Sequence, residues 1–107
     1  MKASDAGAID AAFWDRVYSR NEDIVTRTIA GETFLIPIRN RIADMQRIFA
    51  LNPVAEFIWS ELDGVKSLAE VCTRVINEFH VMRETAMTDI AEFIAELDTA
   101  ALVSEKR

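Results

Sequence analysis

Residues 50–64 constrain the fold most, because they combine the end of a strand, a capped helix and a stop signal in one short stretch. Asn52 is a favourable N-cap, since its side-chain oxygen can accept a hydrogen bond from the first helical turn. Pro53 follows at the first helical position, where its fixed φ fits and its missing N–H costs little. Gly64 tolerates the positive φ that often ends a helix. The stretch therefore predicts a strand followed directly by a helix over about 53–62.

Two further helices are predicted after this one. Ser67 and Glu70 have the spacing of a capping box, in which each side chain bonds the other residue's backbone N–H. Apolar residues then recur at helical spacing: Leu68, Val71, Cys72, Val75, Ile76 and Phe79. The third helix is predicted over about 84–98, with an apolar stripe made of Met87, Ile90, Ala91, Ile94 and Leu97.

The strands are predicted before the helices. Residues 24–29 and 33–38 are rich in β-branched residues and flank Gly31, which is the pattern of a hairpin. A third strand is predicted at about 46–51, after a polar, basic loop. Three strands followed by three helices predict an α+β, winged-helix-like domain with a three-stranded antiparallel sheet.

A chain of 107 residues is long enough for one core and too short for two. We predict the domain over 22–103, a tail over 104–107 and an N-terminal extension over 1–21. The apolar spacing in the extension favours an amphipathic helix over about 8–19. Two interpretations stay open: this helix packs on its own domain, or it contacts a partner or a second copy. A monomer and a homodimer are both compatible with the sequence.

The composition indicates in which cell compartment the protein is expected. No apolar run approaches the roughly 20 residues of a membrane span, and the N-terminus lacks the apolar region of a secretory signal. Cys72 is the single cysteine, which excludes an intrachain disulfide. We therefore expect a cytoplasmic protein without a membrane partner.

The sequence offers little catalytic chemistry. His80 is the single histidine, and Cys72 falls on an apolar helix stripe, so they predict neither a nucleophile nor a zinc site. Three scattered glycines form no phosphate-binding loop. Glu92 and Glu96 are read as a solvated helix face. We predict no enzyme activity and no cofactor.

The charge distribution of the sequence argues against nucleic acid as a binding partner. The net charge is −6, and residues 48–107 carry five basic against eleven acidic residues. Such helices repel a phosphate backbone. A winged-helix DNA-binding regulator nevertheless stays open as the alternative, because loop 39–47 is basic.

The order and spacing of several short motifs resemble the PqqD-like family over about residues 22–103. These motifs are Leu51-Asn52, Ile58-Trp59, Leu62-Asp63-Gly64, Glu70-Val71, Phe79, Asp89-Ile90, Phe93-Ile94, Leu97 and Leu102-Val103. Members of this family are stand-alone versions of the recognition domain found in enzymes that modify ribosomally made peptides, the RiPP recognition element. Residues 35–46 depart from the members that serve pyrroloquinoline quinone synthesis, so the resemblance does not fix the product.

The resemblance implies a peptide-binding adaptor without catalysis of its own. Such an adaptor grips the leader of a precursor peptide and presents it to a modifying enzyme, often a radical-SAM enzyme. It also implies that the leader adds as a strand beside the third strand, here Arg47, Ile48, Phe49, Ala50 and Leu51. The implied groove wall on the third helix consists of Met87, Ile90, Ala91 and Ile94. An edge strand permits this mode, since its unpaired backbone groups can bind an extended peptide.

Overall fold

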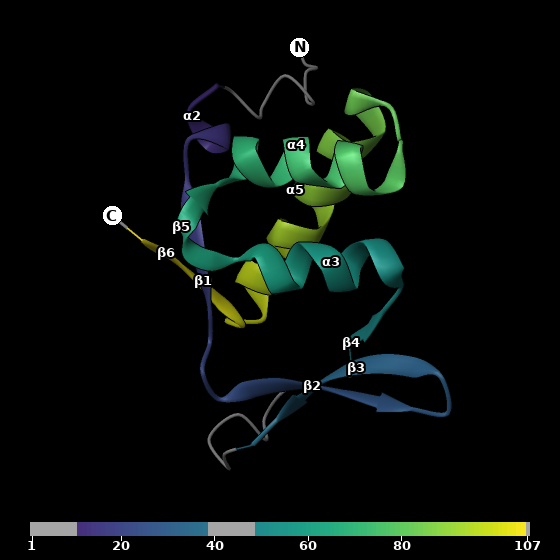
Figure 1. Cartoon of the computed structure of the whole chain (residues 1–107). Helices are drawn as coiled ribbons and strands as arrows, with labels where there is room; N and C mark the ends of the chain where they lie inside the picture. Colours follow the sequence, from purple (N-terminus) through teal and green to yellow (C-terminus); the bar gives the residue numbers. More distant parts are fainter. Residues whose placement is uncertain (1–10, 39–48, 107) are drawn as a thin grey trace.

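The described residues form two three-stranded antiparallel sheets, one short helix and three longer helices (Figure 1). The computed structural model describes residues 11–38 and 49–106. In chain order the elements are α2 (Ala11–Trp14), β1 (Val17–Arg20), β2 (Ile24–Ile29), β3 (Glu32–Pro37), β4 (Phe49–Leu51), α3 (Pro53–Glu61), β5 (Asp63–Ser67), α4 (Leu68–Phe79), α5 (Arg83–Thr99) and β6 (Val103–Lys106). The predicted α+β class, with a three-stranded antiparallel sheet followed by three helices, is confirmed.

The predicted hairpin and third strand form the sheet β2-β3-β4. Strands β2 and β3 pair from Ile24 opposite Pro37 to Ile29 opposite Glu32. The two residues between them, Ala30 and Gly31, both have positive φ, as a tight hairpin turn requires. Strand β4 then pairs with β3, so among the described strands it lies at the edge of this sheet.

The second sheet, β5-β1-β6, was not predicted. The helix expected over 8–19 is wrong at its C-terminal end, because Val17–Arg20 is strand β1 and the described helix ends at Trp14. Strand β1 is the central strand and pairs with β5 and β6. Both partners are distant in sequence, so local periodicity could not reveal the pairing. Residues 8–10 lie outside the described ranges.

The predicted starts of two helices are confirmed by their N-caps. The Ala55 N–H donates to the Asn52 side chain at 2.8 Å, so Asn52 caps α3. Ser67 and Glu70 form both bonds of the capping box at the start of α4. The helices bury the core, in which the largest fully buried side chains are Leu35, Ile58, Leu62, Leu68, Ile90, Ile94, Leu97, Leu102, Val71, Val75 and Cys72. None of the described helices is long and apolar enough to cross a membrane.

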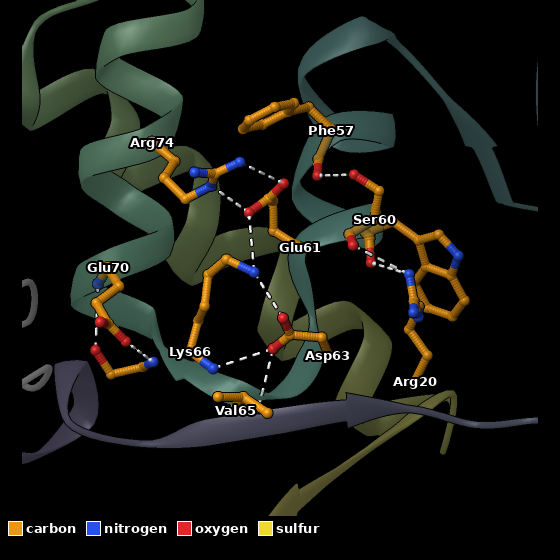
Figure 2. Close-up of polar contacts among 11 residues, drawn as sticks. Arg20, Phe57, Ser60, Glu61, Asp63, Val65, Lys66, Glu70 and Arg74 are labelled. Atoms are coloured by element: carbon orange, nitrogen blue, oxygen red, sulfur yellow. Dashed lines mark hydrogen bonds and ion pairs between the residues drawn. The ribbon is translucent and has the colours of Figure 1, made fainter.

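A polar network joins α3, β5 and α4 (Figure 2). The Arg74 guanidinium of α4 donates to both carboxylate oxygens of Glu61 in α3. Lys66 in β5 lies between two carboxylates, with its Nζ 3.4 Å from Glu61 and 2.6 Å from Asp63. Arg20 of β1 donates to the Ser60 carbonyl at 3.1 Å, near the end of α3. The network fixes α3 relative to α4 and the second sheet.

Candidate functional site

A groove of about 300 Å³ lies between strand β4, helix α3 and helix α5. Its lining residues come from the strand and the first turns of α3 on one side, and from two turns of α5 on the other. They are Phe49, Ala50, Asn52, Val54, Ala55, Ile58, Asp89, Glu92, Phe93 and Glu96. The Asn52 cap positions this wall, because it ends β4 and begins α3 within one residue.

The floor of the groove is apolar and shallow. Phe49 and Phe93 are only 5% and 8% exposed, and Ile58 is 1% exposed, so each presents little surface to a ligand. Val54 and Ala55 at the start of α3 are half-buried and add to the floor. A bound side chain would therefore touch an apolar surface without entering a deep pocket.

The α5 side of the groove is acidic. Asp89, Glu92 and Glu96 are exposed and line it together with Phe93. Their spacing of three and four residues places them on one face of the helix. The groove has no lysine or arginine among its described lining residues. It therefore combines an apolar floor with a negatively charged wall.

The strand side of the groove offers backbone groups. Strand β4 pairs with β3 on one side, and no other described strand pairs with its second side. Phe49 and Leu51 turn their side chains into the core, whereas Ala50 is exposed. An edge strand of this kind can accept a further strand through backbone hydrogen bonds.

The structure separates the predicted site residues into four groups. Phe49 and Ala50 line the groove, and Leu51 is buried beside it. Ile90 and Ile94 are 0% and 2% exposed, so they belong to the core. Met87 and Ala91 are half-buried on α5 and are not among the groove-lining residues. Arg47 and Ile48 lie outside the described residues.

Sequence reasoning missed the α5 residues that line the groove. The strongest apolar stripe of α5 faces the core, so the groove takes the neighbouring face, which includes Asp89, Glu92 and Glu96. The sequence shows the spacing of Glu92 and Glu96, but it favours the interpretation of these two residues as a solvated helix face. Phe93, between the two faces, was part of the family motif and not of the predicted site.

The other reactive groups lie elsewhere. Cys72 is buried in α4, and burial raises the pKa of its thiol, which keeps the thiol protonated. His80 is exposed at the end of α4, in a left-handed conformation. Neither residue lines the groove, and the described part of the chain contains no cluster of His, Cys, Asp or Glu suited to a metal ion.

Fold and site together define a small winged-helix-like domain in which, among the described strands, a sheet edge lies beside an acidic helix. Residues 32–103 match the family model described as Coenzyme PQQ synthesis protein D (PqqD). The chain belongs to the PqqD family, as the motifs in its sequence predicted. The match begins at β3 and ends at the first residue of β6, so β1 and β2 precede it.

A solved structure has the same fold. It is described as TbiB1 in complex with the TbiA(beta) leader peptide, and its TM-score with this chain is 0.62. The two sequences are 24% identical, and the alignment covers 80% of this chain and 94% of that one. No curated protein matches the sequence.

Proposed function

We propose that this protein is a non-catalytic adaptor that captures the leader of a ribosomally made precursor peptide by β-strand addition and presents it to a modifying enzyme. The observation that carries the proposal is the open edge of β4 beside a groove. Membership of the PqqD family supports it, and so does the likeness to TbiB1, a protein described in complex with a leader peptide. A radical-SAM enzyme is the partner class that the family resemblance implies.

In this proposal the leader lies in the groove as a fourth strand next to β4. Its backbone bonds the outer side of β4, and its side chains contact the floor and α5. Strand β4 has three residues, so a docked strand forms about two to four backbone hydrogen bonds. At about 1 kcal/mol each, these bonds alone give millimolar affinity or weaker. Contacts of side chains with the groove must therefore supply the rest of the affinity and all of the selectivity.

The absence of catalysis is part of the proposal. The two side chains with the best nucleophile or base chemistry, Cys72 and His80, do not line the groove, and the thiol is buried. The described lining residues of the groove all belong to one chain, so the proposed binding mode requires no second copy. A single buried cysteine also suits the reducing cytoplasm, where we place the adaptor.

The test is a titration of ¹⁵N-labelled protein with synthetic leader peptides of the precursors encoded near its gene. We expect one leader to shift the amide signals of β4 and of α5 residues 89–96, with little change in the β5-β1-β6 sheet. A folded protein that binds none of these leaders, or binds one at another surface, contradicts the proposal. A salt-sensitive shift of duplex DNA would instead favour the DNA-binding alternative, which neither comparison supports.

A further inference from the structure

The acidic wall of the groove contains carboxylates that are not neutralised within the described structure. Asp89 and Glu92 are exposed, and neither forms an ion pair or a side-chain hydrogen bond with a described residue. The one basic residue of α5 is Arg83, at the first residue of the helix. Two negative charges therefore face a groove whose described lining contains no positive charge.

The spacing of the acidic residues suits an extended peptide. Asp89, Glu92 and Glu96 lie about one helical turn apart, which corresponds to roughly 5 Å along the helix axis per step. Side chains on one face of a β-strand repeat every second residue, or about 7 Å. Long, flexible lysine or arginine side chains bridge the small difference. Basic residues at alternate positions of a docked strand can therefore reach successive carboxylates.

Because the floor is shallow, the acidic side chains have a larger share in peptide selectivity. Because Phe49 and Phe93 present little surface, an apolar anchor in the groove gains only part of the free energy of full burial. Backbone hydrogen bonds with β4 form with any sequence, so they cannot distinguish one peptide from another. The acidic wall is the feature of the described groove that can discriminate between peptides by charge.

We propose that the groove selects peptide segments with lysine or arginine at alternate positions next to one apolar residue. This inference rests on the proposed function and names the class of leader that the groove accepts. The juxtaposition that carries it is the open edge of β4 opposite the unpaired Asp89 and Glu92. Acidic or neutral leaders of the same length bind more weakly, because no described lining residue of the groove compensates the charges of Asp89 and Glu92.

The experiment selects binders from a displayed library of random 15-residue peptides, using the full chain as bait. The same selection is repeated with Asp89→Lys/Glu92→Lys. We expect wild-type binders to be enriched in alternating lysine or arginine, and binders of the reversed variant to be enriched in aspartate or glutamate. A synthetic wild-type binder should lose about 10-fold or more in affinity for the reversed variant, and its affinity should fall with added salt.

A matched control distinguishes the effect of the acidic wall on binding from the effect of the protein's net charge. Glu84→Gln/Asp98→Asn removes two negative charges from the same helix outside the groove, and it should change affinity less than about 2-fold. Asp89→Asn/Glu92→Gln removes the same charge at the groove and should cost roughly 3- to 10-fold. Binders that shift β4 and α5 signals but show no charge preference overturn the charge inference and leave the adaptor proposal standing. Failure to obtain binders, or binding at another surface, contradicts the adaptor proposal itself.

Discussion

The carboxylate of Glu61, at the last residue of α3, accepts hydrogen bonds from Nε and Nη2 of the Arg74 guanidinium in α4 (Figure 2). Glu61 is 9% exposed, whereas the Arg74 side chain is half exposed. A buried carboxylate needs such a partner, because desolvation disfavours its charged form. The pair fixes the end of α3, and the other end of the same helix forms one wall of the groove.

Replacement of Glu61 by glutamine should lower the free energy of unfolding by about 1 kcal/mol, since a charged hydrogen-bonded pair becomes a neutral contact in a buried position. Urea unfolding followed by circular dichroism measures the change. Glu32→Gln, on an exposed residue at the start of β3, serves as the control and should leave stability within about 0.5 kcal/mol. Equal stabilities of the two variants would show that the Glu61 pair contributes little.

Acid should weaken the fold through the same network. Hydrogen bonding with Arg74 lowers the pKa of Glu61 despite the opposing effect of burial, and the Lys66 ammonium together with two backbone N–H groups lowers the pKa of Asp63. A carboxylate with a lowered folded-state pKa stabilises the fold above its unfolded pKa and loses this contribution as pH falls. Unfolding free energy should therefore decrease below about pH 5. Urea unfolding at several pH values should show a shallower decrease for Glu61→Gln/Asp63→Asn, and parallel curves would contradict the assignment.

A bulky side chain at the exposed Ala50 should block the groove. Ala50→Arg introduces a long side chain at a groove-lining position of β4 without removing a core contact. We expect leader affinity to fall at least 10-fold while the melting temperature changes little. Ala69→Arg, on the exposed face of α4 away from the groove, is the matched control and should bind normally. Full binding by folded Ala50→Arg would place the peptide elsewhere.

Strand β1 should be essential for stability although the family match begins after it. Tyr18 is 3% exposed in the core, and its truncation to alanine should cost about 3 kcal/mol by leaving a cavity. Tyr18→Phe removes only a long hydrogen bond from Arg16, at 3.5 Å, and should be nearly neutral. Urea unfolding distinguishes the two variants. A cost below about 1 kcal/mol for Tyr18→Ala would show that β1 does not belong to the folded core.

The sequence predicted the elements whose signals are local. Asn52, Gly31 and the Ser67–Glu70 capping box specify turns and helix ends through contacts only a few residues apart, and each lies where it was predicted. The β5-β1-β6 sheet was missed because its strands are four or five residues long and pair across most of the chain. A short strand surrounded by helical spacing carries no local signal for such a partner.

For the candidate site, the sequence indicates which strand and which helix to consider, but not which face of the helix borders the groove. The third predicted strand and the third predicted helix both line the groove, and binding of a leader there stays a prediction. Ile90 and Ile94 are apolar enough to line a ligand groove, but they are buried in the core. A helix packed on a core buries its most apolar stripe. Sequence periodicity identifies that stripe, but it cannot show which adjacent face borders an opening.

The central position of β1 has a consequence for synthesis of the protein on the ribosome. Val17 pairs with Lys106 and Arg20 with Val103, so the first described strand cannot complete its pairing before the last described strand is synthesised. Translation proceeds at about 5–20 residues per second, so β1 spends several seconds without β6 as a partner. Chaperone contact with the nascent chain is thus expected at Val17–Arg20 until β6 has been synthesised, because Tyr18 and its neighbours are not yet buried.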